Sequence, residues 1–315
     1  MNQRAAPLVA SLLENSDALR LDVRRLDSGA VLVDAGIRAA GGLEAGRRIA
    51  QICLGGLGDV RLSATAGRWP VGLSVTTCDP VLACLASQYA GWSLSAGSGK
   101  DKFQALGSGP ARALAAKEAL FGELGYRDQA ESACLVLEVD RDPPAEVVEK
   151  VVHDCGVAPQ RLTIILTPTH SLAGMVQIIA RVLEVAMHKV HALGFPLGAV
   201  EHGAGSAPVA PPAPDFLTAM GRSNDAILFG GSIQLFVRCE DAQAADLAKR
   251  LPCNASHDYG KPFATIFKDY GYDFYKIDPM LFSPAVISFN NLRTGRCHTF
   301  GRLETGVLRQ SFFPG

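Results

Sequence analysis

Residues 133–139 read ACLVLEV and residues 162–167 read LTIILT, and these two apolar runs decide the fold class. Short runs without alternating polar residues are typical of strands that are buried in a sheet. The segment between them opens with Asp142-Pro143-Pro144, which predicts the start of a helix over 144–155. Strand, helix and strand therefore follow one another, and this order favours layered α/β architecture.

The same alternation continues on both sides of this centre. Residues 19–37 alternate apolar and polar positions around Asp27-Ser28-Gly29, which predicts a β-hairpin. The other expected elements are helices over 43–53, 80–89, from Pro110, 144–155, 171–193, near 215–221 and near 241–250, and strands at 60–65, 71–77 and near 226–237.

A proline-rich stretch interrupts the second half of the chain. Residues 203–214 contain Pro208, Pro211, Pro212 and Pro214, so we expect neither a helix nor a central strand there. A chain of 315 residues also exceeds what one hydrophobic core usually fills. We therefore expect two α/β domains, residues 1–158 and 159–315, with the option that the hairpin 19–37 packs with the second.

The composition excludes several classes of protein. Apolar residues make up 48% and charged residues 19% of the chain, which is a globular composition. Lys and Arg number 30, Asp and Glu number 31, and the chain has no basic run. These features argue against nucleic acid as the main partner. We find no apolar run of about 18 residues and no signal peptide, so we expect a cytoplasmic protein without membrane contact.

The eight cysteines do not form a metal or disulfide pattern. No C-x-x-C occurs, no His pair has zinc-finger spacing, and most cysteines lie in apolar segments such as ICLGG. We interpret them as reduced, buried thiols and expect no bound metal.

The segment 171–193, SLAGMVQIIARVLEVAMHKVHAL, carries the most informative pattern. On one helix its polar residues would fall within an arc of about 80°; they are Gln177, Arg181, Glu184, His188 and His191. Arg181 and Glu184 are an i, i+3 pair that can form an ion pair. A solvent-exposed stripe is one interpretation, but the narrowness of the stripe favours the lining of a pocket.

Three further features allow two interpretations each. The turn in LGSGPARALAAKEAL (106–120) can bind an anion or can simply begin a capped helix, and Arg112 stands where a dinucleotide fingerprint needs glycine. The aromatic segment 254–284 is by default core or subunit interface, and alternatively a stacking surface for a flat heterocycle. Glu138 ends a buried strand, an unusual place for a carboxylate that is neither paired nor used.

Several long strings resemble one family in order along nearly the whole chain, the methenyltetrahydromethanopterin cyclohydrolases. The strings are CDPVLACLASQYAGW (78–92), LGSGPARAL (106–114), QIIARVLEVAMHK (177–189), GRSNDAILFGG (221–231) and HDYGKPFATIFKDYGYDFYKIDPMLFSPA (257–285). The resemblance implies reversible hydrolysis of the cyclic N5,N10-methenyl group of tetrahydromethanopterin to the N5-formyl form, without metal or organic cofactor. It also implies cytoplasmic one-carbon metabolism, in methanogenesis or formaldehyde oxidation by methylotrophs. The family's proteins are typically homotrimers of two-domain α/β chains that bind the pterin in a cleft between the domains.

The resemblance also implies roles for individual residues. Arg181 and Glu184 match the family's catalytic Arg-x-x-Glu, and Glu138 is similar to its strand-end Glu. A substrate-binding Lys corresponds to Lys102 or to Lys100. The other residues expected to bind substrate are Gln88, Tyr89, Ser108, Gly109 and Gln177. This assignment agrees with the chemistry, because water that attacks the cationic carbon must lose a proton, and Glu184 can accept it.

Two other functions remain open at this point. A transferase would bind a phosphorylated substrate at the GSGPAR turn, and a non-catalytic protein would bind the pterin without turnover.

Overall fold

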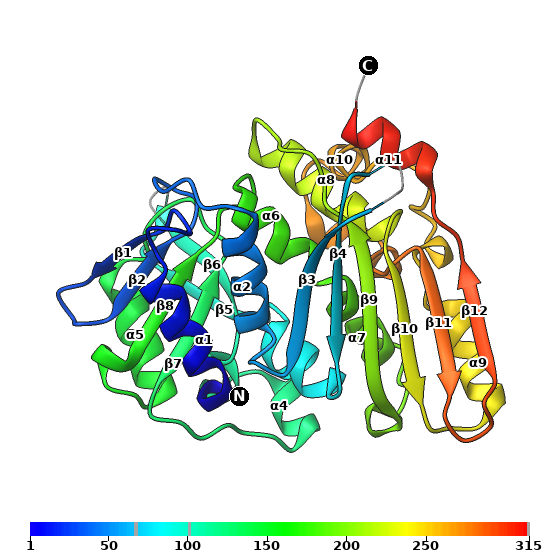
Figure 1. Cartoon of the computed structure of the whole chain (residues 1–315), viewed down its shortest axis with the longest axis horizontal. Helices are drawn as coiled ribbons and strands as arrows, with labels where there is room; N and C mark the ends of the chain where they lie inside the picture. The colour runs from blue at the N-terminus through cyan, green and yellow to red at the C-terminus, as the bar shows by residue number, and fades with distance from the viewer. Residues whose placement is uncertain (66–68, 100–101, 314–315) are drawn as a thin grey trace. The chain divides into compact units, whose positions relative to one another are not determined.

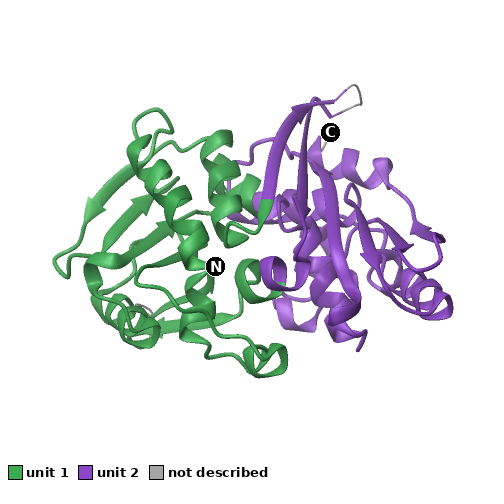
Figure 2. Cartoon of the chain, turned by 60° about the horizontal axis from the view of Figure 1, so that its bottom comes forward, with its two compact units in different colours: residues 1–58, 85–177 green, residues 59–84, 178–315 purple. Residues whose placement is uncertain are grey.

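The computed structural model describes residues 1–65, 69–99 and 102–313 (Figure 1). The described part of the chain forms two compact units, each with its own six-stranded sheet (Figure 2). Unit 1 comprises residues 1–58 and 85–177, and unit 2 comprises residues 59–84 and 178–315. The expected α/β class with two layered parts is confirmed.

The sheet of unit 1 contains the two apolar runs side by side. Its strand order is β1(Asp22–Arg25), β2(Val31–Asp34), β8(Leu162–Leu166), β7(Ala133–Leu137), β6(Phe103–Ser108) and β5(Trp92–Ala96). Strands β2, β8 and β7 are parallel, whereas the outer pairs are antiparallel. All residues of β7 and β8 are buried, as the sequence predicts.

Helices on both faces explain why these strands are apolar at every position except Thr163. Leu135 and Ile164 belong to one core cluster, together with residues of α3(Ala111–Ala115) and α5(Ala145–Cys155). Val136 and Ile165 belong to another, together with residues of α1(Asn2–Glu14) and α2(Leu43–Cys53). Successive side chains of a strand point to opposite faces, so both sets of positions must be apolar. Each such side chain contributes about 1.5–3 kcal/mol when it is fully buried.

The hairpin at 19–37 is confirmed, and it belongs to unit 1 because β2 pairs in parallel with β8. The expected domain boundary at 158/159 falls inside unit 1, between α5 and β8. Strand β8 lies between β2 and β7, so cutting the chain there would divide one sheet. The chain instead passes between the units near residues 58, 84 and 177.

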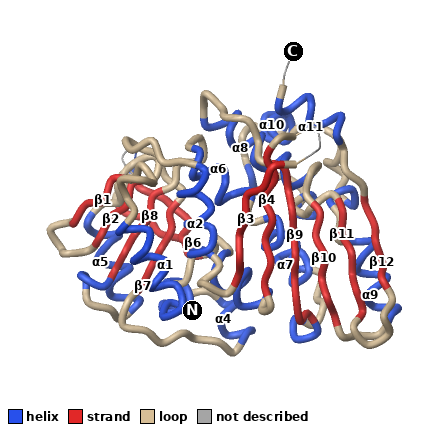
Figure 3. The backbone as a smooth tube through the Cα atoms, viewed as in Figure 1, coloured by secondary structure: helices blue, strands red, loops and turns tan. Residues whose placement is uncertain are grey.

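The sheet of unit 2 corrects two expectations. Its strand order is β12(Cys297–Gly301), β11(Val286–Asn291), β10(Ser232–Val237), β9(Val200–Pro208), β4(Val71–Thr77) and β3(Gly58–Ala64). We expected no central strand at 203–214, yet β9 occupies 200–208 between β4 and β10 (Figure 3). Pro208 is the last residue of β9, so its missing N–H falls where the ladder ends.

The predicted strand near 226–237 begins too early. The helix α8(Phe216–Leu228) continues through 226–228, and β10 starts only at Ser232. The apolar residues Ala226, Ile227 and Leu228 are buried in the helix, and Gly230-Gly231 follow its end. The remaining helices of this unit are α9(Asp241–Arg250), α10(Phe263–Asp269) and α11(Thr305–Phe312).

Two predicted helices have a different form. The segment 171–193 is divided into α6(Leu172–Ile179) and α7(Val182–Ala192), and the Arg181 N–H donates to the Ile178 carbonyl at 2.9 Å across the break (Figure 3). The segment 80–89 contains a π-helix, Val81–Gln88, instead of an α-helix. π-Helical turns are rare and frequently occur at functional sites.

A buried carboxyl group in α8 makes the stability of unit 2 depend on pH. Asp225 is fully buried, its Oδ1 accepts a hydrogen bond from the Phe263 N–H at 2.8 Å, and burial raises its pKa to about 7. The native protein therefore keeps a proton on Asp225 at pH values where the unfolded chain, with a pKa of about 4, has lost it. Stability from this group falls as pH rises from about 4 to 7.

We predict that Asp225→Asn stabilises the protein at pH 8 by about 2–4 kcal/mol, because the neutral amide removes the cost of a buried charge. At pH 4 the difference should be small. Urea unfolding at the two pH values measures this, with Asp246→Asn, at an exposed ion pair with Arg250, as the control. An equal pH dependence of Asp225→Asn and wild type would contradict the prediction.

Candidate functional site

Glycines in β9 allow the first turn of α7 to lie directly on the sheet of unit 2 (Figure 1). A Cβ atom on Gly203 would lie 2.9 Å from Leu183 Cδ2, and one on Gly205 would lie 3.1 Å from Val182 Cγ1. Both distances are too short or very tight for a side chain, so this approach requires glycine. The packing fixes Arg181 at the N-terminal cap of α7 and Glu184 in its first turn.

Arg181 and Glu184 form an ion pair, with 3.5 Å between Nη1 and Oε2. The Glu184 residue is only 4% exposed. Burying a charge costs several kcal/mol unless a partner compensates, and here the guanidinium and the helix N-terminus both favour a carboxylate. The Glu184 charge is also one reason, after burial, why the pKa of the buried Cys84 thiol is raised. The pair thus supplies a largely dehydrated carboxylate that can accept a proton.

The wider polar stripe does not persist in the structure. Gln177 lies on α6 in unit 1, whereas the other members lie at or after the helix break in unit 2. His188 is exposed and His191 is half-buried. The interpretation as one continuous seam is wrong because it assumed an unbroken helix.

In unit 1 the structure brings three of the predicted substrate-binding residues together. The Ser108 hydroxyl donates to the Gln88 carbonyl at 2.7 Å, and the Gly109 N–H donates to the Ser87 carbonyl at 2.8 Å. Gly109 has φ +97°, a conformation that favours glycine. Ser108 and Gly109 therefore satisfy carbonyls at the end of the π-helix.

The GSGPAR turn begins a helix, as one of its two interpretations expects, but without the expected cap. The Gly109 N–H is engaged by Ser87, so it is not directed at an anion. Pro110 is the N-terminal cap of α3 instead of its first residue, and Ser108 provides no side-chain cap to that helix. The backbone N–H groups of this turn are partly used to satisfy carbonyls at the end of the π-helix, so fewer of them are free to bind a ligand.

Glu138 and Lys102 lie elsewhere in unit 1. Strand β7 ends at Leu137, and the Glu138 carboxylate accepts a hydrogen bond from the Thr169 hydroxyl. Glu138 is exposed, so its carboxylate is not the buried group that its place after the strand suggests. Lys102 is exposed too, and its carbonyl accepts a hydrogen bond from Arg141 Nη2 at 2.6 Å.

Lys102 immediately precedes β6 and Ser108 is its last residue, so the two lie about 20 Å apart at a rise of about 3.3 Å per residue. Only a long substrate could contact both. Lys100 lies outside the described residues.

Gln177 is the most distinctive polar residue of α6. It is 1% exposed, and neither its Nε2 nor its Oε1 atom has a hydrogen-bond partner among the residues that the structure describes. Buried amides in proteins are normally satisfied, by protein, water or ligand. A buried amide whose donor and acceptor both lack a protein partner is suited to binding a ligand.

Comparison with known proteins identifies the family. The family described as "Cyclohydrolase (MCH)" matches residues 1–312. The chain belongs to this family. It is 60% identical over 314 residues to the methenyltetrahydromethanopterin cyclohydrolase of Methylobacillus flagellatus, covering 99% of this chain and 95% of the relative.

Two other cyclohydrolases extend the comparison. The one from Xanthobacter autotrophicus is 59% identical, covering 98% of this chain and 90% of the relative. The one from Methanothermobacter marburgensis is 41% identical, covering 99% of this chain and 98% of the relative. The family that the sequence resembled is confirmed.

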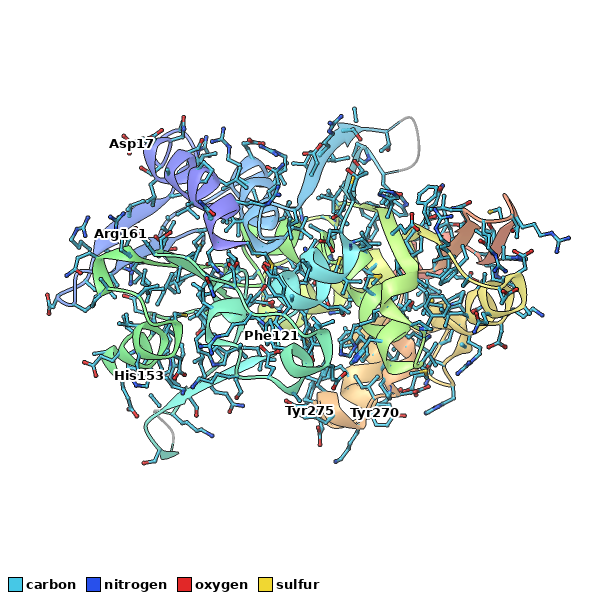
Figure 4. The ribbon with its side chains drawn as sticks, turned by 90° about the horizontal axis from the view of Figure 1, so that it is seen from below. Asp17, Phe121, His153, Arg161, Tyr270 and Tyr275 are labelled. Atoms are coloured by element: carbon cyan, nitrogen blue, oxygen red, sulfur yellow. The ribbon has the colours of Figure 1, made fainter. Side chains whose placement is uncertain are left out.

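The aromatic segment of this cyclohydrolase family member combines core and surface. Phe263 is fully buried, and the rings of Phe274 and Phe282 lie 6.1 and 5.9 Å from its own. Tyr272 is 54% exposed, and Tyr275 is 89% exposed. The Tyr275 side chain is labelled in Figure 4. The core interpretation holds for the phenylalanines around Phe263, and a role of the exposed tyrosines in subunit contact stays a prediction.

The structure also describes the cysteines and the helices of this family member. All eight cysteines are free, and five of them are buried. Among the described residues, no group of three or more His, Cys, Asp or Glu is arranged to hold a metal ion. None of the helices in the described ranges is long and apolar enough to cross a bilayer.

Proposed function

We propose that this chain hydrolyses 5,10-methenyltetrahydromethanopterin to 5-formyltetrahydromethanopterin, reversibly, with Arg181 and Glu184 as its catalytic residues. The observation that carries the proposal is the buried ion pair of these two residues at the start of α7. Membership of the cyclohydrolase family supports the substrate.

The substrate's own charge explains how two side chains can suffice. Its methenyl carbon lies between N5 and N10 and shares one positive charge with them, so it is already electrophilic. Glu184 takes a proton from water as the oxygen bonds to this carbon, which gives a neutral tetrahedral adduct. The bond between carbon and N10 then breaks, its electron pair goes to N10, and Glu184 returns the proton there. As the C=O bond forms, the hydroxyl group of the adduct loses its proton to the Glu184 carboxylate and from there to solvent. The formyl group remains on N5.

Arg181 has two tasks in this scheme. Its guanidinium holds the Glu184 carboxylate in place and favours its ionised form. A carboxylate also attracts the cationic ground state, so catalysis requires that it be placed to gain more in the transition state. A guanidinium beside the carboxylate limits the ground-state attraction.

We propose that residues of unit 1 bind the pterin; they are Gln88, Tyr89, Lys102, Ser108, Gly109, Glu138 and Gln177. Gln177 has the strongest support, since its buried amide has no partner among the described residues. The pyrimidine edge of a pterin presents the N3–H donor beside the C4 carbonyl acceptor, and one amide group can pair with both.

Gln177→Leu is expected to raise KM about 5- to 100-fold with a much smaller change in kcat, because a polar edge of the substrate is left unpaired. Steady-state kinetics measure this, with Gln129→Leu, at an exposed position of the same unit, as the control. An unchanged KM in the folded variant would remove Gln177 from the binding site.

We further propose a cytoplasmic homotrimer that acts in one-carbon metabolism such as formaldehyde oxidation and needs no metal. The family resemblance supports these properties. Light scattering would give the oligomeric state, and activity after exhaustive chelation would test the independence from metal.

The nature of the product tests the proposed reaction. Incubation in ¹⁸O-water followed by NMR and mass spectrometry should give a formyl group on N5 that carries the label. A formyl group on N10 would overturn the proposed direction of ring opening. Unchanged substrate bound to the protein would favour a non-catalytic pterin-binding protein.

A further inference from the structure

Arg112 of α3 is fully buried in unit 1, although the sequence suggested only that it replaces a glycine. Its Nη1 group donates to the Leu85 carbonyl at 3.0 Å and to the Ser87 carbonyl at 3.1 Å. Both carbonyls belong to the last turn of the π-helix, where a helix leaves such groups without intrahelical partners. Arg112 therefore acts as a cap for the end of the π-helix.

Glu118 holds this guanidinium in a fixed orientation. Arg112 Nε donates to Glu118 Oε1 at 2.9 Å and Nη2 donates to Oε2 at 2.6 Å, which is a bidentate pair. Gly91 makes room for it, because a Cβ atom there would lie 1.9 Å from Glu118 Oε2. Glu118 thus fixes the plane of the guanidinium through Nε and Nη2, while Nη1 bonds the π-helix carbonyls.

Two aromatic rings complete the surroundings of Arg112. The guanidinium carbon lies 5.2 Å from the centre of the Tyr89 ring and 5.5 Å from that of Phe121. Both distances are within the range of cation–π attraction. Arg112 therefore contacts the backbone just before Gln88 and the side chain of Tyr89.

We infer that Arg112, oriented by Glu118, is a positioning residue that sets the placement of Gln88 and Tyr89 for substrate binding. The inference rests on the proposed role of these two residues in binding the pterin. Ser108, at the end of β6, and Gly109, which follows it, hold the same helix end, so Arg112 is its third support.

Stability alone does not require an ion pair between the buried Arg112 and the half-buried Glu118. A buried pair can often be replaced by well-packed apolar residues with little loss of stability or with a gain, whereas loss of one partner leaves a costly unpaired charge. The planar guanidinium of Arg112 bonds two carbonyls and one carboxylate at once and so fixes their relative orientation. Lysine or an apolar residue cannot do this.

The test compares Arg112→Lys, Glu118→Gln and the double variant R112M/E118L. We expect KM for the methenyl substrate to rise at least about 10-fold in each, with kcat within about 3-fold of wild type. Arg24→Lys is the matched control, because Arg24 forms a bidentate pair with Asp142 in the same unit away from the π-helix. This control should keep the wild-type KM.

The double variant separates positioning from stability. It removes both charges and should be more stable than either single variant, although the Leu85 carbonyl loses its donor. A raised KM in this stable variant supports positioning, and a wild-type KM overturns it. If wild type itself shows no turnover, the proposed function fails, and the dissociation constant for the methenyl substrate, measured by equilibrium dialysis, then decides the positioning role by the same comparison.

Discussion

Glu184→Gln is expected to lower kcat by about 10²–10⁴-fold, because the amide keeps the shape of the side chain but cannot accept the proton from water. KM should change little, since binding groups in unit 1 are untouched. Steady-state kinetics on the purified variant measure both values, and circular dichroism verifies the fold. Glu201→Gln on β9, which loses an ion pair with Arg238, is the control and should retain wild-type kcat.

A Glu184→Gln variant with turnover near that of wild type would remove Glu184 from the mechanism. If Glu184→Gln does not fold, Glu184→Asp, which moves the carboxylate by about one methylene, is the second test. It should fold and still lose rate, because proton transfer requires hydrogen-bond reach.

Arg181→Leu is expected to be nearly inactive at neutral pH and to recover part of its rate as pH rises. Without the guanidinium at 3.5 Å, the buried Glu184 tends to take up a proton, since desolvation disfavours its charged form. Raising the pH restores the carboxylate and with it the base. A pH–rate profile of the variant beside wild type measures the recovery.

The shape of that profile distinguishes two roles of Arg181. If Arg181 contacts the transition state or orients the substrate, the loss should be about equal at every pH, because no protonation step limits the rate. A uniform deficit would therefore contradict the charge-balancing role. Full activity at neutral pH would contradict both roles.

The sequence predicted the central strands of unit 1 well because their environment leaves a simple signal. Strands β7 and β8 are covered by helices on both faces, so every position in ACLVL and LTIIL except Thr163 is apolar. The hairpin of β1 and β2 was equally visible, since a turn sequence stands between two alternating segments.

Features that depend on tertiary packing were not visible. The break between α6 and α7 has neither glycine nor proline at Ala180 and Arg181, so nothing local marks it. Strand β9 carries Gly203 and Gly205 because α7 lies against them, a reason that only the folded chain reveals. Its final residue, Pro208, favours a loop when the sequence is read alone, whereas in the fold it only ends the strand.

The candidate site shows the same division. The ion pair of Arg181 and Glu184 depends only on their spacing along the chain. The helix break does not disturb it, because both residues lie on the C-terminal side of the break. The pairing of Arg112 with Glu118 crosses the end of α3 and depends on the π-helix beside it. Its only sequence signal was one arginine among the alanines and leucine of PARALAA.

One measurement tests the central claim most directly: the absorption of the methenyl chromophore after adding the purified protein to a large molar excess of 5,10-methenyltetrahydromethanopterin. The account predicts loss of the chromophore over many turnovers per protein chain, far faster than in buffer or with Glu184→Gln. Loss that stops at one equivalent per chain, or a rate equal to that in buffer, would contradict it.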